Sequence, residues 1–457
     1  MAGLSTVSKA AGIAASVRDA GIVGAGGAGF PTHVKLQASC ETVIANGAEC
    51  EPLLESDKYL LRREPEAVVA GLELVMQAAE AREGIIAVKK KAMDSLGTLK
   101  KIVDARDEIR ILELENFYPA GDEQILVYEA TGKTVPPMGL PLEAGCLVQN
   151  IETLRNIHQA GKDNTPVTRR FLTCTGMVRT PSVVEAHIGT SVREIVRLCG
   201  TELDDDMAVV LGGPMMGRVE ADADAPVSKT TSGIIVLPRE HDLIRRKTLS
   251  LEVIIKQAKA VCCQCNYCTE LCSRYLIGHP LQPHKIMRQV GYGLDVPEEV
   301  IKSAFLCSEC GLCEIYACVM GISPALVNRI LKEKLTSAGY KPEFSVPPGD
   351  FFDWKSLRDF RKIPTSRIIN RLGLGEFDHL SVRFGVKTDP DRVEISLRQH
   401  IGATARLQVK AGDTVKEGAL IGEIPEESLG ARVHASMSGR VIFADEERVV
   451  ITRGEGK

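Results

Sequence analysis

The sequence predicts a multidomain protein of mixed α/β and α+β class, and three observations support this prediction. The chain has 457 residues, and a single domain usually has about 100–200 residues, so two to four domains are expected. Strand and helix patterns alternate in the first third of the chain, which is typical of an α/β layer. Nine of the 14 cysteines lie between residues 262 and 318, in a region of helical pattern.

The composition is that of a globular protein of the cytoplasm. Hydrophobic residues make up 44% and charged residues 25% of the chain, an ordinary balance for a packed domain. The net charge of −4 gives no basic surface for nucleic acid. No apolar run reaches the roughly 20 residues of a membrane span, and the N-terminus lacks the apolar core of a secretory signal. The cysteines are therefore expected to be reduced thiols.

Residues 1–165 are predicted to form an α/β domain. Strands are expected at residues 43–46, 84–89, 109–114 and 147–150, with helices at 64–80, 90–103 and 152–160. Residues 21–29 contain five glycines, so their backbone can approach a ligand closely. The loop lacks the dinucleotide G-x-G-x-x-G spacing. Polar turns end the predicted strands, and such positions gather ligand-binding groups in an α/β sheet.

Four further segments follow this domain. Residues 166–245 are predicted to form a small β-rich module with one helix at 192–199. Residues 246–340 form the helical region around the cysteines, and residues 341–392 are predicted to be a linker with a helix at 365–372. Residues 393–457 have an all-β pattern with turns at 411–418 and 436–439.

The cysteines of the helical region form two similar motifs. Three cysteines spaced two residues apart wrap a loop around one face of a [4Fe–4S] cluster, and in two-cluster ferredoxins the fourth cysteine ligates the other cluster. By this rule the first cluster is held by Cys262, Cys265, Cys268 and Cys318, and the second by Cys307, Cys310, Cys313 and Cys272.

A pair of zinc sites is the alternative for these motifs. Zinc usually takes two Cys-x2–4-Cys pairs per ion, and a third cysteine at the same tight spacing favours iron–sulfur clusters. Two features depart from the ferredoxin pattern: Ser273 and Val319 stand where proline usually follows the fourth cysteine, and the second motif has one extra residue before Cys318. Cys263 breaks the spacing and receives no role.

Several segments carry a family resemblance. Residues 24–32 (GAGGAGFPT) resemble the flavin loop of the 51-kDa NADH-oxidising subunits of respiratory complex I. Residues 46–52 (NGAECEP), 118–123 (YPAGDE) and 150–153 (NIET) resemble the further FMN and NADH segments in the same order. Residues 166–240 resemble the β-grasp module that follows in this family, and the two-cluster region resembles the RnfC components of Rnf complexes.

The order of the domains resembles one branch of this family. RnfC proteins carry a barrel-sandwich module at the N-terminus, whereas here the similar module is C-terminal. That order, together with residues 226–231 (PVSKTT), 276–279 (LIGH) and 397–402 (LRQHIG), resembles the cobalamin reductases of propanediol-utilisation microcompartments. The barrel also resembles lipoyl domains, but its hairpin tip at 436–439 (SMSG) has no lysine for a prosthetic group, which predicts a docking or structural role.

The resemblance implies the residues of the flavin site. FMN contacts are expected from Gly24, Gly26, Gly27, Gly29, Phe30, Lys35, Asn46, Tyr118, Asn150 and Thr153. Four acidic residues are expected to border the flavin and nicotinamide pocket as catalytic groups: Glu49, Glu51, Asp122 and Glu123. The complex I loop has arginine where Ala25 stands and aspartate where Ala48 stands, so contacts to the flavin must differ at these two positions.

The resemblance also implies an activity. The implied activity is that of an NADH-dependent reductase inside a bacterial microcompartment. Electrons would pass from NADH to FMN, then to two [4Fe–4S] clusters and finally to cob(III)alamin or cob(II)alamin. Expected partners are a microcompartment shell or a cobalamin adenosyltransferase. Two alternatives stay open: an electron-transfer subunit that reduces a protein partner, as in Rnf-type or glycyl-radical systems, and a zinc-stabilised scaffold without catalysis.

Overall fold

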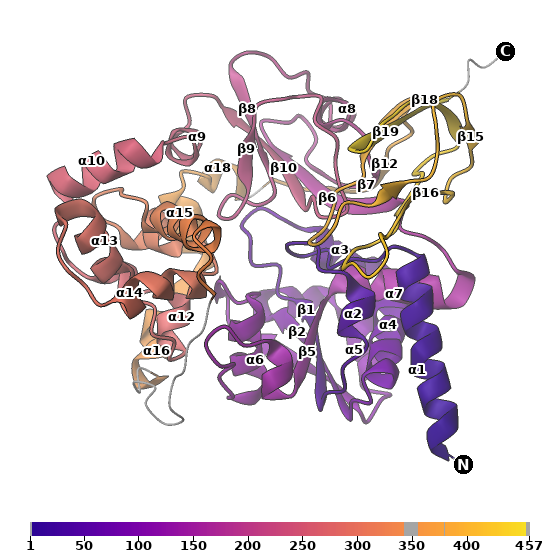
Figure 1. Ribbon diagram of the computed structural model, residues 1–457, viewed down its shortest axis with the longest axis horizontal. Coiled ribbons are helices and arrows are strands. Elements are labelled where there is room, and N and C mark those ends of the chain that lie inside the picture. Colours follow the sequence, from indigo (N-terminus) through magenta and orange to yellow (C-terminus); the bar gives the residue numbers. More distant parts are fainter. Residues whose placement is uncertain (1, 342–354, 379, 454–457) are drawn as a thin grey trace.

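The computed structural model describes residues 2–341, 355–378 and 380–453, and its N-terminal part is built on a four-stranded parallel sheet (Figure 1). The strand order is β3-β2-β1-β5, and every neighbouring pair is parallel. All four strands predicted from the sequence are confirmed to within one residue at either end. Their bounds are β1 (Thr42–Gly47), β2 (Glu83–Lys89), β3 (Ile109–Leu114) and β5 (Cys146–Asn150).

Helices cover both faces of this sheet, so its strands are apolar on both sides, as parallel strands usually are. Val43 and Ala45 point into a core formed with α1, α4, α5 and α7, whereas Ile44 points into a second core formed with α6. Pro65 begins α4, as the sequence suggested. The helices are α1 (Ala2–Asp19), α2 (Thr32–Lys35), α3 (Ser56–Arg63), α4 (Pro65–Ala78), η1 (Lys90–Ser95), α5 (Gly97–Val103), α6 (Glu123–Thr131), η2 (Pro141–Ala144) and α7 (Ile151–Asp163).

The order of the strands creates a crevice at the carboxyl edge of the sheet. The chain proceeds outward from β1 to β2 and β3, and then returns to place β5 on the other side of β1. Asn46 and Asn150 are the last register partners of β1 and β5. Ligands of open α/β sheets bind where the strand order reverses in this way. These two asparagines therefore lie at the expected ligand site of the sheet.

The β-rich module contains a six-stranded mixed sheet of order β12-β7-β6-β10-β8-β9. The predicted helix is confirmed as α8, whose Val192, Ile195 and Val196 pack into the core of this sheet. The elements are β6 (Arg169–Gly176), β7 (Ser182–His187), α8 (Val192–Leu198), β8 (Met207–Leu211), β9 (Arg218–Glu220), β10 (Gly233–Pro238) and β12 (Arg383–Lys387).

The segment predicted as a linker, residues 341–392, contributes to two other parts of the chain. Its strand β12 pairs in parallel with β7, and its strand β11 (Ile363–Pro364) pairs with β4 (Phe117–Tyr118). The predicted helix is confirmed as α17 (Thr365–Arg371), which lies between α16 (Lys355–Arg361) and α18 (Gly375–Asp378). Residues 342–354 and 379 lie outside the described residues. Only one of the five residues of β12 is buried. The strand therefore lacks the alternation of apolar and polar residues by which a strand is recognised in a sequence.

Short helices form the cysteine-rich region, around a core of Ile254, Ala258, Ile286 and Met287. Within the part of the chain that the structure describes, no helix combines the length and apolar character of a membrane span. The elements are α9 (Asp242–Lys247), α10 (Leu251–Val261), α11 (Tyr267–Glu270), α12 (Ser273–Leu276), α13 (Pro283–Tyr292), α14 (Glu298–Lys302), η3 (Ser303–Leu306), η4 (Cys313–Ala317) and α15 (Pro324–Ser337).

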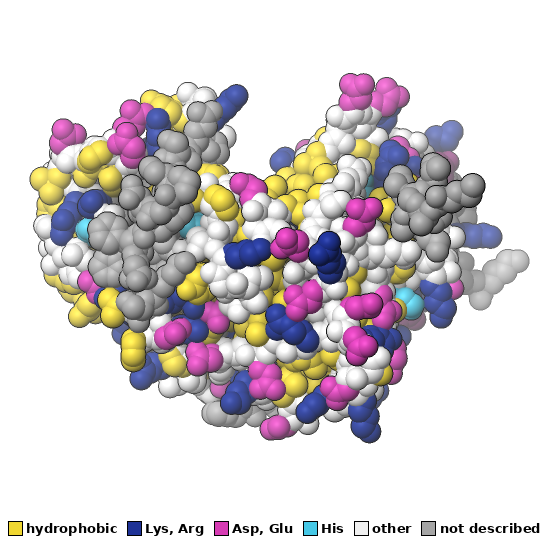
Figure 2. Space-filling view, turned by 90° about the horizontal axis from the view of Figure 1, so that it is seen from below, with side chains coloured by type: hydrophobic (Ala, Val, Ile, Leu, Met, Phe, Trp, Pro, Cys, Tyr) yellow, Lys and Arg dark blue, Asp and Glu magenta, His cyan; other side chains and the backbone are white. Residues whose placement is uncertain are grey.

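The C-terminal module consists of two small sheets, β13-β19-β18-β15 and β14-β16-β17, which enclose one apolar core. It lies beside the β-rich module and the C-terminal end of α1 (Figure 1). Figure 2 shows one face of the molecule, on which basic and acidic side chains are interspersed. The strands are β13 (Arg392–Ser396), β14 (Arg406–Leu407), β15 (Thr414–Val415), β16 (Leu420–Glu423), β17 (Val433–His434), β18 (Gly439–Ala444) and β19 (Arg448–Thr452).

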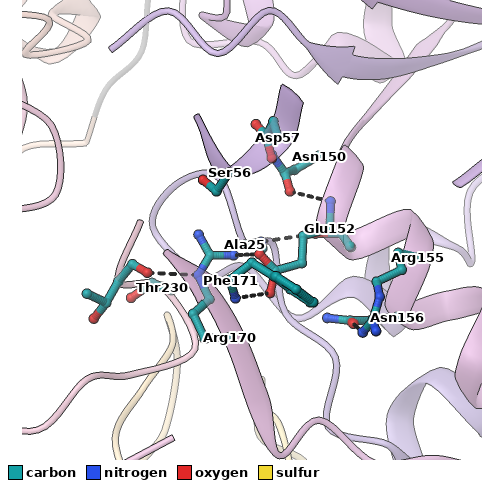
Figure 3. A network of polar contacts seen from close by, with 12 residues as sticks. Ala25, Ser56, Asp57, Asn150, Glu152, Arg155, Asn156, Arg170, Phe171 and Thr230 are labelled. Carbon is teal, nitrogen blue, oxygen red and sulfur yellow. Dashed lines mark hydrogen bonds and ion pairs between the residues drawn. The ribbon is translucent and has the colours of Figure 1, made fainter. Parts of the chain in front are cut away.

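Two buried basic side chains join these parts. Arg170 of β6 forms an ion pair with Glu152 of α7, and both side chains are less than 5% exposed (Figure 3). Arg170 also donates to the carbonyl oxygen of Thr231 at 2.8 Å. Lys229 is 3% exposed, and its Nζ donates to the carbonyl oxygens of Gly21 at 2.7 Å and Arg432 at 2.6 Å. This lysine therefore ties the β-rich module to both the N-terminal part and the C-terminal module.

Replacing Arg170 is expected to destabilise the fold strongly. Arg170→Leu leaves the Glu152 carboxylate buried without its cation, which costs about 3–5 kcal/mol of unfolding free energy. The measurement is the urea midpoint of the holoprotein. Arg193→Leu is the control, because Arg193 and its partner Asp224 are 45% and 63% exposed and such pairs contribute about 1 kcal/mol or less. Equal shifts for the two variants would contradict this expectation.

Lys229 is expected to make stability depend on alkaline pH. Burial lowers the pKa of Lys229 from 10.5 to about 7, so between these values the unfolded chain binds the proton and the folded protein does not. Stability from this group therefore rises as the pH rises through that window. The urea midpoint of wild type should exceed that of Lys229→Met by more at pH 9 than at pH 7, whereas exposed Lys256→Met should show no such change. A pH-independent difference for Lys229→Met would refute this expectation.

Candidate functional site

The glycine loop forms a tight turn whose base is fixed by hydrogen bonds. The amide of Gly24 donates to the carbonyl oxygen of Phe30 at 2.9 Å, and the amide of Ala25 donates to Oγ1 of Thr153 at 3.0 Å. Gly26 and Gly27 are exposed, and a Cβ added at Gly27 would meet no atom within 4 Å. The tip of the loop therefore presents bare backbone to open space.

Gly29 closes the loop against the C-terminal module. Its φ is +75°, and a Cβ there would lie 2.9 Å from Cγ2 of Thr230 and 3.1 Å from the backbone of Gln399 and His400. Only glycine meets both conditions without strain. The carbonyl oxygen of Gly29 also accepts from the amide of Ile401 at 3.3 Å. The C-terminal module therefore contacts the glycine loop directly. This contact gives the module a structural role.

The N-terminus of α7 lies beside the loop. Asn150 is its N-cap, and Oδ1 of Asn150 accepts from the amide of Glu152 at 2.9 Å. A Cβ at Gly26 would lie 2.9 Å from Nδ2 of Asn150. A helix N-terminus beside an open glycine backbone favours a phosphate group. The residues present therefore fit the phosphate of a flavin such as FMN.

Lys35 and Asn46 organise that edge. Nζ of Lys35 forms an ion pair with Glu123 at 2.9 Å and donates to the carbonyl oxygen of Val148 at 3.3 Å. It also lies 6.0 Å from the centre of the Phe30 ring. Nδ2 of Asn46 donates to the carbonyl oxygen of Gly121 at 2.9 Å. The loop before α6 is thereby fastened to the ends of β1 and β5.

Glu49 and Glu51 are turned into the protein. Glu49 accepts from Oγ of Ser56 at 3.2 Å and from the amide of Lys58 at 3.0 Å. Glu51 accepts from the amides of Met215 and Met216 at 2.8 and 2.9 Å, which belong to the turn after β8. Burial is the main cause that raises the pKa of both carboxyls. Each side chain fixes a loop beside the crevice, and their catalytic role stays a prediction.

Two titratable residues beside the crevice were not predicted from the sequence. The carboxylate oxygens of Asp57 accept from Nδ2 of Asn150 at 3.1 and 3.0 Å (Figure 3). Burial and the nearby Glu49 raise the pKa of Asp57. Lys89 ends β2 and donates to Oγ1 of Thr365 at 3.1 Å, and burial lowers its pKa to about 8. The position of Lys89 at the end of a predicted strand could have identified it as a site residue. No local sequence pattern around Asp57 indicates that it lies beside the crevice.

Tyr118 and Asp122 face the cysteine-rich region. The hydroxyl of Tyr118 donates to the carbonyl oxygen of Cys310 at 2.6 Å, and the ring is 1% exposed. Asp122 caps α6 and forms an ion pair with Arg274 at 2.7 Å. Both residues were expected at the flavin site, and the structure places them between the carboxyl edge of the sheet and the second cysteine motif. A contact of Tyr118 with the flavin stays a prediction.

The eight motif cysteines line two separate cavities. Cys262, Cys265, Cys268 and Cys318 line one cavity, and we call this group the first cage. Cys272, Cys307, Cys310 and Cys313 line another cavity, and we call this group the second cage. This grouping is the crossed one expected from the ferredoxin pattern.

The cages fit iron–sulfur clusters better than zinc ions. The sulfurs around one tetrahedral zinc lie about 3.8 Å apart and leave no cavity, whereas these thiols surround a space. Burial raises the pKa of Cys268 and Cys310, and a bound metal centre would favour their thiolate forms. The extra residue before Cys318 is absorbed by a π-helical turn, Cys313–Ala317. Cys263 is exposed beside the first cage.

Comparisons with known proteins agree with this arrangement. Family models match residues 17–159 as a Nuo51 FMN-binding domain, 261–323 as a 4Fe-4S dicluster domain and 384–455 as an RnfC barrel sandwich hybrid domain. Cobalamin reductase PduS of Citrobacter freundii is 42% identical over 450 residues, which is 98% of each chain. The Salmonella typhimurium protein of the same name is 41% identical over 96% of each chain.

A more distant relative matches over a shorter segment. It is one component of the Na(+)-translocating ferredoxin:NAD(+) oxidoreductase complex of Acetobacterium woodii, and it is 36% identical over 265 residues, or 57% of each chain. The two PduS proteins, in contrast, match from end to end. The chain is therefore an electron-transfer oxidoreductase with FMN-binding and 4Fe-4S domains, and it belongs to the family of PduS cobalamin reductases.

Proposed function

We propose that this protein transfers electrons from NADH, by way of FMN and two [4Fe–4S] clusters, to cobalamin in a bacterial microcompartment. Each NADH supplies two electrons and reduces two cob(III)alamins to cob(II)alamin, or two cob(II)alamins to cob(I)alamin, with release of NAD⁺ and one proton. The names of the two full-length relatives support cobalamin as the acceptor. The Nuo51 FMN-binding domain supports FMN and its NADH donor.

One observation carries the proposal: the flavin region and the second cage are in direct contact. Tyr118 bonds to the backbone of Cys310, and Asp122 of the flavin region pairs with Arg274 beside the second cage. Cys50, Tyr118 and Cys310 also belong to one packed apolar cluster. A flavin accepts two electrons as hydride and releases them singly, and an iron–sulfur cluster carries one electron. Contact between the two regions is what such a transfer requires.

The residues of the chain are proposed to act as follows. The amides at Gly26 and Gly27 and the α7 N-terminus bind the flavin phosphate, and Lys35 balances negative charge at the flavin. Asn46, Asn150, Thr153 and Glu49 hold the loops in position, while the exposed Glu123 would border the approach for the nicotinamide. The buried protein around Tyr118 excludes water between the flavin region and the second cage.

Enlarging Gly27 is expected to prevent flavin binding without unfolding the protein. A Cβ at Gly27 meets nothing within 4 Å, so Gly27→Val fills only the space assigned to FMN. We expect its affinity for FMN to fall by more than about tenfold, which is more than 1.4 kcal/mol. Fluorescence titration of the apoprotein measures this affinity. Gly97→Val is the control, because its Cβ site is also open; flavin binding by Gly27→Val at wild-type strength would refute the assignment.

Removing one thiol from either cage is expected to remove one cluster. Wild type should contain about eight irons per chain, and Cys265→Ala and Cys310→Ala about four each. Cys263→Ala is the control and should retain about eight. Iron and acid-labile sulfide analysis of anaerobic protein measures the content. Two zinc ions per chain, or a full iron content in Cys265→Ala, would contradict the ligand assignment.

A further inference from the structure

The two cages differ in their exposure to solvent. Cys265 of the first cage and the neighbouring Cys263 are exposed. In the second cage Cys310 packs into the same apolar cluster as Tyr118, beside Leu312 and Ile315, which are each 3% exposed. An electron donor or acceptor from solution can therefore approach the first cage more closely than the second.

The two cages also differ in their neighbours. The second cage contacts the flavin region through Tyr118 and Asp122. It also contacts the β-rich module, because a Cβ at Gly311 would lie 3.3 Å from the carbonyl oxygen of Met215. The contacts of the first cage are with its own region: Tyr292 donates to the carbonyl oxygen of Cys262 at 3.0 Å, and Arg288 donates to Asn266 at 3.1 Å. The second cage is thus central and the first is peripheral.

Exposed apolar side chains form a rim at the first cage. Val261, Tyr267, Val319 and Met320 are 39%, 45%, 55% and 44% exposed. The cavity itself is lined by thiols, by the amides Gln264 and Asn266 and by apolar side chains, and it has no lysine, arginine, aspartate or glutamate among the described residues. His284 also lines it, and its Nδ1 lies 2.7 Å from Oγ1 of Thr269.

We infer that electrons enter the clusters at the second cage and leave at the first, where cobalamin docks against the rim formed by Val319 and Met320. This inference rests on the proposed function and adds the order of the cages and the place of the acceptor. One electron leaves the first cage for each cobalt centre reduced, so two cobalamins react for each NADH oxidised.

The chemistry of the rim favours cobalamin over a protein acceptor. Cobalamin presents an apolar macrocycle edged by neutral amides, which matches apolar side chains together with Gln264 and Asn266. A small acidic electron-carrier protein would instead need basic side chains around the cage, since opposite charges steer such encounters. The cavity lining, as far as the structure describes it, offers none. The basic Arg288 and Lys285 near His284 are both half-buried, and Arg288 is engaged by Asn266.

The order of the cages is tested by electron paramagnetic resonance of anaerobic protein. In Cys310→Ala, dithionite should reduce the first-cage cluster, but NADH should not. In Cys265→Ala, NADH should still reduce the second-cage cluster. The opposite pattern, or reduction of both single clusters by NADH, overturns the order. If NADH reduces no cluster in wild type, the proposed function itself fails, so the two failures are distinguishable.

The docking surface is tested with steady-state kinetics. Val319→Asp places a charge on the rim and should raise the KM for cobalamin about tenfold. Electron paramagnetic resonance should show that NADH still reduces both clusters in this variant. Ile442→Asp is the matched control, since Ile442 is 52% exposed on β18 of the C-terminal module, and its KM should equal that of wild type. An unchanged KM in Val319→Asp overturns the docking site. Slowed reduction of ferredoxin with an unchanged KM for cobalamin would instead assign the rim to a protein.

Discussion

The geometry of the parallel sheet is the constraint on which the rest of the structure depends. Because all four strands run the same way, their carboxyl ends meet at one edge, and the order β3-β2-β1-β5 opens that edge between β1 and β5. Asn46, Lys89 and Asn150 all stand at the ends of strands. The glycine loop then has one position available, beside the N-terminus of α7, and the later segments pack around that position.

Buried polar side chains fasten those later segments to the sheet. Glu152 and Arg170 join α7 to β6, and Lys229 joins the glycine loop to the barrel. Buried ion pairs contribute little net stability, because their desolvation offsets their attraction, but removing one partner is costly. Each of these contacts therefore strongly disfavours any arrangement that separates the domains. Gly29 shows the consequence, since it has space for nothing but hydrogen between Thr230 and His400.

The cysteine-rich region is packed closely on the FMN-binding domain, as the proposed electron transfer between them requires. The hydroxyl of Tyr118 donates a hydrogen bond to the carbonyl oxygen of Cys310, and the carboxylate of Asp122 forms an ion pair with Arg274. Strand β11, from the segment expected to be a linker, adds to this junction by pairing with Phe117 and Tyr118. The junction is buried and apolar, whereas the first cage lies at the periphery of the region.

The sequence by itself determined the features that depend on neighbouring residues. The spacing of the cysteines, the four strands of the sheet and the bare glycine loop are local patterns, because each is formed within a few residues of the chain. Even the crossed grouping of the cysteines followed from a spacing rule. Only the tertiary structure decided which loops meet. Tyr118 and Cys310 are 192 residues apart, Lys229 and Arg432 are 203 apart, and β12 carries no alternation to reveal its partner. Such contacts are set by packing between distant segments, and no local pattern encodes them.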